Sequence, residues 1–163
     1  MLFRKVLISE DLDEPRSIVL DLDHGFMFWS DWGKNPRIER AWMDGRQREI
    51  IINTELVWYV GYCPCLSLLI VSPFRPNGLA LDSKNKKLYW CDAKLDRIEM
   101  ASVDGSERRV VTDRNLPHPF GFSLLGEHLY WTDWQDRNIQ RADKAGGANR
   151  LVMVSHLDDL VSH

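Results

Sequence analysis

The chain has 163 residues, with 21 Lys and Arg residues against 24 Asp and Glu residues and a formal net charge of −3. This length allows one domain with a hydrophobic core. The nearly balanced charge, with no basic stripe along the sequence, argues against a nucleic-acid-binding protein.

The N-terminal residues, MLFRKVLISEDLDEP, meet an acidic cluster within ten residues. A secretory signal peptide has an apolar core at this place, so we expect none here. The longest apolar stretch, around 66–71, is shorter than the roughly 20 residues that a membrane helix needs. We therefore expect no membrane-spanning segment and no direct membrane contact, and nothing in the sequence directs the chain out of the cytoplasm.

An internal repeat organises most of the chain. Three segments align with one another, and a second shared phrase precedes each of them. The resulting units are 14–52, 75–111 and 118–154. Their anchoring tryptophans, Trp29, Trp90 and Trp131, are 61 and 41 residues apart, and removing the 17 residues 59–75 reduces the first spacing to 44. Residues 59–75 are therefore an insertion in an otherwise regular array.

Each unit contains four short runs that have the character of β-strands. In the middle unit they are 78–81, 88–92, 97–101 and 108–111. The Asp-Gly pairs at 44–45 and 104–105 precede the fourth run, and Asp-Gly is a strong hairpin signal because Gly tolerates a positive φ. Four strands in a period of about 40 residues are typical of a β-propeller blade. A leading run, 4–9, resembles the last strand of a preceding blade.

The aromatic run of each unit carries a common motif: LYWTDW at 129–134, FWSDWG at 28–33 and LYWCDAK at 88–94. These residues resemble the YWTD repeat, which is also called the low-density lipoprotein receptor class B repeat. The resemblance covers nearly the whole chain except 59–75. It implies an all-β fold in which the chain supplies about three four-stranded blades of a six-bladed β-propeller.

Longer phrases, such as GKNPRIERA, PNGLALD and LPHPFGFSLLGEHLYWTDWQ, are most similar to the Wnt co-receptor type among the low-density lipoprotein receptor-related proteins. The resemblance implies the extracellular ligand-binding part of a single-pass plasma-membrane receptor. The implied partners are secreted Wnt-type ligands, their Dickkopf-type antagonists and the missing blades of the ring. No cofactor is implied.

Three units are half of the ring that the resemblance implies, and each end of such an arc leaves one blade face without a neighbour. Two interpretations stay open. The chain is a truncated or mispredicted fragment of a larger receptor with no independent activity, or two halves pair to complete a ring.

The insertion, 59–75, contains two of the three cysteines and no acidic residue. In the family pattern a Trp directly precedes Pro-Asn-Gly, whereas here 17 residues, or 51 nucleotides, separate Trp58 from Pro76. The codons at both edges can be written as a splice donor and a splice acceptor whose removal restores one Trp codon. Our hypothesis is that 59–75 is translated intron. The alternative is a genuine surface-loop insertion, which costs little entropy.

One aspartate recurs at the same place in each unit, at Asp31, Asp92 and Asp133. A catalytic or metal site would need these carboxylates to converge on one centre. The alternative, which we favour, is that each carboxylate accepts hydrogen bonds from neighbouring backbone. The repeated tryptophans are likewise expected to pack between blades or across strands: Trp29, Trp90 and Trp131.

Trp32 and Trp134 follow the aromatic strand where the chain turns onto the rim, and the middle unit has Ala93 there. The repeat itself therefore does not require tryptophan, and both an exposed aromatic anchor and simple packing are consistent with the pattern. In the resembling receptors the top face offers aromatic residues ringed by acids to protein ligands. Matched motifs carry this ligand-binding role to five residues: Trp32, Asp92, His118, Phe120 and Trp134.

Three further residues are possible additions to this patch. Asp159 and Val161 lie in the C-terminal HLDDLVSH, where Val161 replaces a larger Met that the resemblance leads us to expect. Trp42 stands where the other units have Ser102 and Asp143, and it is either an extra contact or a local substitution.

Motifs of the common enzyme classes, namely G-x-S-x-G, the P-loop and H-E-x-x-H, are missing from the sequence. Cys63 and Cys65 lie in the insertion without partners at metal-ligand spacing, and Cys91 is expected to be a small core residue. We predict no catalytic residue, no metal site and no enzyme activity. The competing class is a metal-dependent propeller enzyme, which would need inward-facing acids or histidines around a bound metal.

Overall fold

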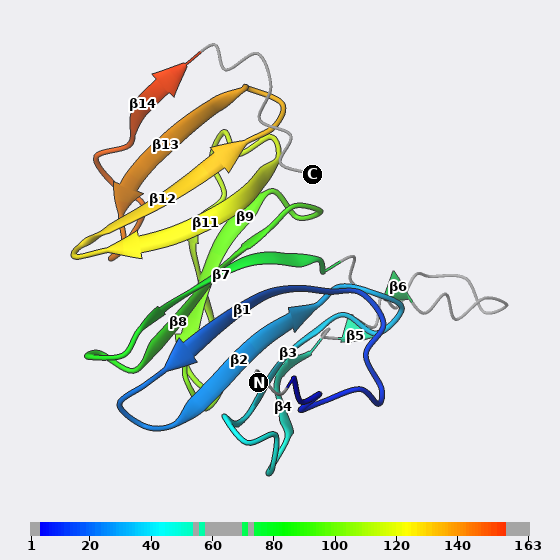
Figure 1. Ribbon diagram of the computed structural model, residues 1–163. Coiled ribbons are helices and arrows are strands. Elements are labelled where there is room, and N and C mark those ends of the chain that lie inside the picture. Colours follow the sequence, from blue (N-terminus) through cyan, green and yellow to red (C-terminus); the bar gives the residue numbers. More distant parts are fainter. Residues whose placement is uncertain (1–3, 54–55, 58–69, 72–73, 156–163) are drawn as a thin grey trace, which may run out of the picture.

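The computed structural model describes residues 4–53, 56–57, 70–71 and 74–155, and these form an all-β structure (Figure 1). Three four-stranded sheets account for most of it. The first contains β1 (Pro15–Asp21), β2 (Phe26–Asp31), β3 (Arg37–Trp42) and β4 (Glu49–Asn53). The second contains β7 (Pro76–Asp82), β8 (Lys87–Asp92), β9 (Arg97–Ser102) and β10 (Arg109–Thr112). The third contains β11 (Pro119–Leu125), β12 (His128–Asp133), β13 (Asn138–Asp143) and β14 (Leu151–Ser155).

Each sheet is an antiparallel meander whose strands follow chain order, and we call the three sheets blade 1, blade 2 and blade 3. The predicted Asp-Gly turns join the third and fourth strands, and Gly45 and Gly105 have φ values of 88° and 86°. A side chain on Gly45 would also meet the carbonyl oxygen of Leu7 at 2.7 Å. Glycine is therefore required here both by the backbone conformation and by the close approach of a neighbouring segment.

The blades fan about a common axis with their first strands innermost, so that β7 lies between β1 and β11 (Figure 1). One side chain in the second strand of blade 1, and one in that of blade 2, ties its blade to the next. The Ser30 hydroxyl accepts a hydrogen bond from the Ser17 N–H and donates to the Asn77 carbonyl at 2.9 Å. The Cys91 thiol repeats this pattern, accepting from the Gly78 N–H and donating to the Phe120 carbonyl at 3.2 Å.

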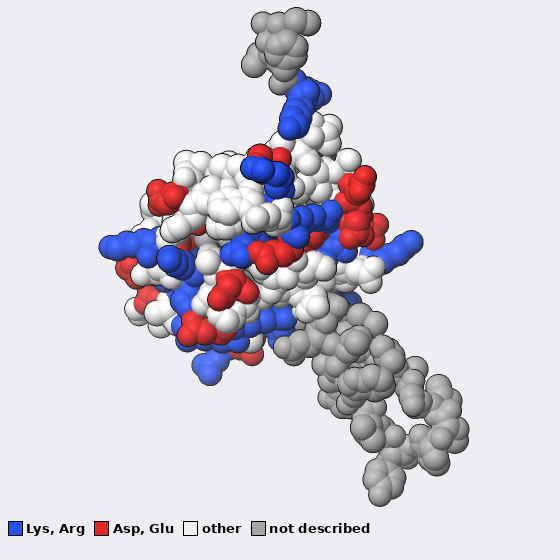
Figure 2. Space-filling model, turned by 90° about the horizontal axis from the view of Figure 1, so that it is seen from below, with Lys and Arg blue, Asp and Glu red and all other residues white. Residues whose placement is uncertain are grey.

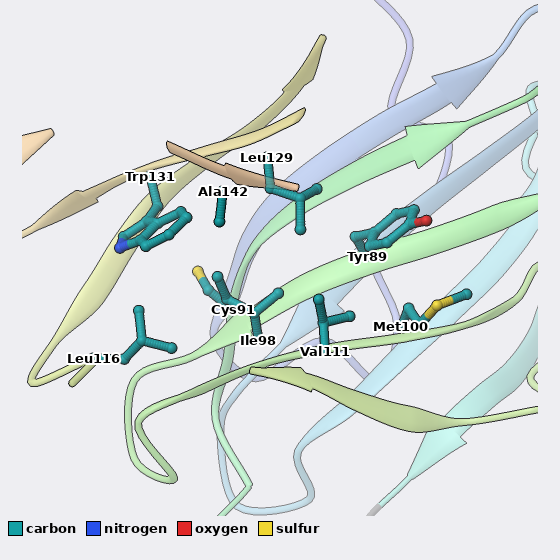
Figure 3. Close-up of a cluster of buried hydrophobic side chains, with 9 residues drawn as sticks. All are labelled: Tyr89, Cys91, Ile98, Met100, Val111, Leu116, Leu129, Trp131 and Ala142. Atoms are coloured by element: carbon teal, nitrogen blue, oxygen red, sulfur yellow. The ribbon is translucent and has the colours of Figure 1, made fainter. Parts of the chain in front are cut away.

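The hydrophobic core lies between the blades, because alternate residues of each strand face the preceding and the following blade. Between blades 2 and 3, blade 2 contributes Tyr89, Cys91 and Ile98, and blade 3 contributes Leu129 and Trp131 (Figure 3). The equivalent cluster between blades 1 and 2 combines one set of residues from each blade: Phe28, Ile38 and Ile52 with Leu88, Trp90 and Ala101. Trp90 and Trp131 thus contribute large buried areas to the packing of one blade on another, whereas Trp29 packs with Ile8 and Leu12.

Residues 4–9, which resemble the last strand of a preceding blade, form no strand in the structure. A fourth strand pairs with the third strand of its own blade, and the described residues 4–14 contain no such strand. Ile8 and Leu12 nevertheless pack on Met27 and Trp29 of blade 1. The segment therefore lies against the blade through side chains, without ladder hydrogen bonds.

Most of the insertion 59–75 lies outside the described residues, so the translated-intron hypothesis stays a prediction. Its described parts include β6 (Ile70–Val71), which pairs with β5 (Leu56–Val57) in a small two-stranded sheet. Phe74 is buried in the core between blades 1 and 2 and meets Trp90 edge to face at 6.4 Å. The last two residues of the insertion thus belong to the propeller rather than to a separate loop.

The surface carries both signs of charge, and Figure 2 shows basic and acidic side chains intermixed on the face seen from below. Among the described residues there is no helix that is long and apolar enough to cross a membrane.

Candidate ligand-binding rim

Three buried aspartates support the end of the blades at which the second strands stop. Asp31, Asp92 and Asp133 close β2, β8 and β12 and are fully buried. The carboxylate of Asp92 accepts hydrogen bonds from the backbone N–H groups of Arg75, Lys94 and Leu95 at 2.8–3.0 Å. Asp133 accepts the equivalent three bonds, whereas Asp31 accepts two of them, from Glu14 and Gly33, and its third bond from the Asp13 N–H. Each carboxylate therefore fixes both the turn after its strand and the segment that enters the blade.

This arrangement decides the role of Asp92, which the sequence suggested as a ligand contact. A fully buried carboxylate with three backbone donors is not available to a partner protein, so Asp92 belongs with Asp31 and Asp133. The error has a plain cause, because a motif match identifies a position and not its exposure.

The pKa values of two of these aspartates move in opposite directions. Burial raises the pKa of Asp92 above its ordinary value, and its backbone donors only partly oppose this. Burial acts in the same direction on Asp31, but three backbone N–H groups and the guanidinium of Arg37 outweigh it and hold the pKa below its ordinary value. The Arg37 guanidinium lies 3.8 Å from the Asp31 carboxylate. The ionised form of the aspartate is therefore favoured at Asp31 in blade 1 and disfavoured at Asp92 in blade 2.

Three positions above the aspartates form the rim of each blade. A backbone hydrogen bond pairs the residue after the second strand with the residue before the first strand, as in Trp134 N–H to His118 O at 3.1 Å. The third position is the residue directly after the proline that begins the first strand. The three positions are filled by Glu14, Arg16 and Trp32 in blade 1, by Arg75, Asn77 and Ala93 in blade 2, and by His118, Phe120 and Trp134 in blade 3. Asn77 and Ala93 are buried, so Arg75 is the exposed member of this set in blade 2.

The rim of blade 3 is an aromatic cluster made of residues that the sequence identified. Phe120 stacks on Trp134 with ring centroids 4.3 Å apart and an angle of 20° between the planes. His118 lies against the same indole at 5.6 Å. Trp134 is exposed, whereas Phe120 and His118 are half-buried. The indole is thus held by its neighbours while one side stays open to solvent.

The rim of blade 1 uses the same position for a cationic stack. The guanidinium of Arg16 lies 3.8 Å from the ring centroid of Trp32, and that of Arg75 from blade 2 lies at 5.4 Å. Trp32 is half-buried as a result, so it is less open than Trp134. The sequence left packing and exposure as alternatives for both tryptophans. In the structure Trp32 is the more packed of the two and Trp134 is the more exposed.

Three rim residues were missed by the sequence analysis: Arg16, Arg75 and Asp96. Arg16 could have been found from its place after Pro15, which matches the place of Phe120 after Pro119. Asp96 is an exposed residue of blade 2, and burial raises its pKa above the ordinary value, which the charge of His118 in blade 3 only partly opposes. No sequence signal for this interaction exists, because the two residues belong to different blades.

Other residues considered from the sequence lie elsewhere. Trp42 is at the opposite edge of blade 1, where it stacks on Phe26 at 4.2 Å and its Nε1 donates to Gln47. Cys91 is fully buried, and burial raises the pKa of its thiol to about 12. Asp159 and Val161 lie outside the described residues. Within the described ranges, no group of three or more His, Cys, Asp or Glu side chains could hold a metal ion.

Comparison with known families identifies the repeat. The family model for the low-density lipoprotein receptor repeat class B matches residues 25–58 and 86–122. The chain belongs to the low-density lipoprotein receptor class B repeat family. Its matched residues include the aromatic strands, the Asp-Gly turns and the buried aspartates of blades 1 and 2, which are the features that define the blade.

The curated relatives include several receptor proteins. The chain is 44% identical to a human low-density lipoprotein receptor-related protein 5-like protein, over 96% of this chain and 55% of that protein. It is 49% identical to human low-density lipoprotein receptor-related protein 5 over 93% of this chain, and 34% identical to the vitellogenin receptor Yl of Drosophila melanogaster over 88%. It spans only 9% and 6% of those two larger receptors.

Solved structures agree on the propeller. A chain in the crystal structure of a nidogen/laminin complex superposes with a TM-score of 0.74 at 31% identity, covering 94% of this chain and 51% of that chain. A gluconolactonase from Xanthomonas campestris superposes with a TM-score of 0.67 at 16% identity, which indicates a shared fold alone. The three blades therefore correspond to about half of a six-bladed YWTD propeller.

Proposed function

We propose that the chain is part of the extracellular ligand-binding module of a receptor related to the low-density lipoprotein receptor. Its proposed ligands are secreted proteins of the Wnt type or their Dickkopf-type antagonists. The observation that supports this most directly is the open aromatic cluster of blade 3, in which Phe120 and His118 hold an exposed Trp134. The identity to the human receptor-related protein 5 supports the ligand class.

The rim chemistry favours a protein ligand over a small molecule. Aromatic and arginine side chains dominate the energetics of protein interfaces, because they bury large areas with little loss of conformational freedom. Here a tryptophan with an aromatic neighbour in blade 3 and a tryptophan with two arginines in blade 1 lie on one rim, with Ala93 between them. A ligand that spans all three blades would meet an apolar anchor at one end and positive charge at the other.

Binding in this proposal has two steps with different physical origins. The Trp134 indole enters an apolar pocket of the ligand, and its supporting ring Phe120 limits the entropy lost on binding. Arg16 and Arg75 pair with acidic groups of the ligand, and they gain orientation from their stacking on Trp32. The charged contacts set the association rate and specificity more than the affinity.

The test is a binding titration of the chain, or of a longer receptor that contains it, with an immobilised Dickkopf-type antagonist. Trp134→Ala should weaken binding by about 2 kcal/mol, or roughly 30-fold, because an anchor residue is removed. Trp42→Ala is the matched control, since it removes the same side chain from the opposite edge of the propeller. Equal losses for the two variants, or no loss for Trp134→Ala, would contradict the proposal.

The match to a gluconolactonase does not support a catalytic function, because at 16% identity it reports only the fold. In the described part of the chain the three repeated aspartates are also committed to backbone N–H groups.

A further inference from the structure

Two arginines converge on one indole at the junction of blades 1 and 2. The guanidinium of Arg16, from blade 1, lies 3.8 Å from the ring centroid of Trp32, and that of Arg75, from blade 2, lies 5.4 Å from the same centroid. Both distances are within the roughly 6 Å over which a cation is attracted to an aromatic face. Both arginines are exposed, whereas the indole is half-buried. The ring therefore holds two positive charges close together at the surface.

The charges of these two arginines are less neutralised than those of other arginines in the same blades. Arg108, for example, lies 2.9 Å from a carboxylate oxygen of Glu99. Arg16 has Glu14 at 3.7 Å, and the two side chains are 40% and 56% exposed, so this pair is loose. Among the described residues, Arg75 forms no ion pair with a carboxylate. Both guanidinium groups therefore keep N–H donors for an external anion.

The backbone that carries Arg75 is fixed by its neighbours. Its N–H donates to the buried carboxylate of Asp92 at 3.0 Å, and its carbonyl accepts from the Ala93 N–H at 3.3 Å. The preceding residue, Phe74, is buried in the core between blades 1 and 2. When a ligand binds, the arginine therefore loses only side-chain freedom, and its stacking on the indole already removes part of that freedom.

Arg75 is supplied by the insertion, of which it is the last residue. In the repeat pattern a Trp directly precedes Pro-Asn-Gly, so that Trp58 would stand at this rim position if residues 59–75 were absent. The equivalent positions hold Glu14 in blade 1 and His118 in blade 3. The positive charge that blade 2 adds at this junction therefore comes from a residue that the repeat does not prescribe.

We propose that Arg16 and Arg75 bind two neighbouring carboxylates of the protein ligand, and that Arg75 determines the preference for such an acidic segment. The inference rests on the proposed function, since it specifies which ligand the same rim selects. One carboxylate pairs with each guanidinium, while the indole of Trp32 holds both guanidinium groups in place. A tryptophan in place of Arg75 would offer an aromatic surface instead of the second charge, and the preference for acidic ligands would be lost.

The surroundings of the two arginines favour a short acidic segment of a protein over a sulfated polysaccharide. Glu14 and Asp96 are exposed on the same rim and would repel a long row of negative charges. The chain as a whole also carries a formal net charge of −3. The aromatic cluster of blade 3, with its exposed Trp134, offers a further contact that suits an apolar side chain. A protein with acidic and apolar side chains therefore matches both parts of the rim.

The experiment measures how the full chain discriminates between two fluorescein-labelled peptides of the same length. Both contain a leucine, and one carries two adjacent glutamates where the other carries two glutamines. Fluorescence anisotropy gives the two dissociation constants. We expect the glutamate peptide to bind about 5-fold more tightly at low ionic strength, because two exposed ion pairs are added. The ratio should fall towards one in about 0.5 M NaCl, where exposed charges are screened.

Three variants assign the preference to the arginine pair. Arg75→Gln should reduce it to about 2-fold, because one of the two ion pairs is lost. Arg46→Gln is the matched control and should leave it unchanged, since it removes a positive charge from the turn between β3 and β4, where Arg46 pairs with Asp44. Glu14→Gln should increase the preference, because it removes the carboxylate that competes for Arg16. An increase cannot result from misfolding.

Equal binding of the two peptides, binding of neither, or equal effects of Arg75→Gln and Arg46→Gln would overturn the inference. Tighter binding of heparin than of the glutamate peptide would overturn it as well and indicate a polyanion site. The proposed function fails separately. If Trp134→Ala leaves binding of the Dickkopf-type antagonist unchanged while the preference still depends on Arg75, the acidic-segment site stands and the proposed ligand is wrong. If Trp134→Ala weakens that binding but the two peptides bind equally, only the inference about the arginines fails.

Discussion

The rim and the layer of aspartates beneath it are formed by the same turns of the chain, yet they differ in how much the blades vary. Below the rim, Asp31, Asp92 and Asp133 each accept three backbone hydrogen bonds, two of which are equivalent in all three blades. On the rim, the residue after the second strand is tryptophan in blades 1 and 3 and alanine in blade 2. The repeat therefore determines the layer of aspartates, whereas the side chains that a ligand would meet differ from blade to blade.

The physical reason is the cost of changing each layer. A buried carboxylate that satisfies three backbone donors cannot be replaced without leaving those donors unpaired. The rim side chains of blades 1 and 3 lie beside solvent, so their replacement leaves no buried polar group behind. Specificity can therefore vary on the rim without loss of the fold, which is how loops on a rigid scaffold acquire function.

The largest expected effect breaks the supporting layer. Asp133→Ala removes the acceptor for the N–H groups of His118, Gln135 and Asp136, which lie 3.0–3.2 Å from the carboxylate. We expect the free energy of unfolding to fall by about 3 kcal/mol, because buried donors are left unpaired. Urea denaturation followed by tryptophan fluorescence measures this change.

Asp136→Ala is the control for that experiment, since its side chain is exposed although its N–H contributes to the same turn. Its effect on the free energy of unfolding should stay within about 0.5 kcal/mol. A similar loss of stability in both variants would mean that the turn, rather than the buried carboxylate, responds to the change, and the two layers would not differ as described.

A smaller effect distinguishes two members of the supporting layer by pH. The pKa of Asp31 is lowered in the folded state, so its ionised form stabilises the fold and this contribution is lost as the pH falls below its ordinary value of 3.8. The pKa of Asp92 is raised, so its contribution is present at low pH and is lost as the pH rises above 3.8.

The free energy of unfolding should therefore change its dependence on pH in opposite directions in Asp31→Asn and Asp92→Asn, measured across this pH range. Stability should depend less on acidification in Asp31→Asn, because the group that loses its charge is gone. In Asp92→Asn the loss of stability on raising the pH through the same range should be reduced. Changes of the same sign would show that Arg37 does not distinguish the two sites.

The fold was accessible from the sequence because it depends on features that recur. The aromatic strands, the Asp-Gly turns and the period predict three four-stranded blades, and the structure confirms this fold. The rim could be predicted only in part, because the exposure of a side chain depends on neighbours from other blades. Trp32 and Trp134 occupy equivalent places, but only contacts of Arg16 and Arg75 cover the first. Asp92 was assigned to the rim because its motif matched, and burial places it in the layer below.

Deletion of the insertion is expected to change the free energy of unfolding least, and it tests directly how the rim of blade 2 differs from the other two. If residues 59–75 are removed and Trp58 joins Pro76, Leu56 stands three residues before the proline of blade 2. Leu12 and Leu116 hold that place before Pro15 and Pro119, and Leu116 is buried in the core. Leu56 can then supply the apolar group that Phe74 now places in the core between blades 1 and 2.

The same deletion puts Trp58 in the rim position that Arg75 now occupies, next to Trp32. We expect the free energy of unfolding to change by less than about 1 kcal/mol, because a long surface insertion contributes little to stability. Fluorescence quenching by iodide should report one additional accessible tryptophan, compared with a Trp58→Phe version of the shortened chain. A large loss of stability would show that Phe74 is required in the core and that the insertion belongs to the fold. A stable shortened chain with an accessible Trp58 would place aromatic residues on the rim of all three blades, and the rim of blade 2 would then resemble those on either side of it.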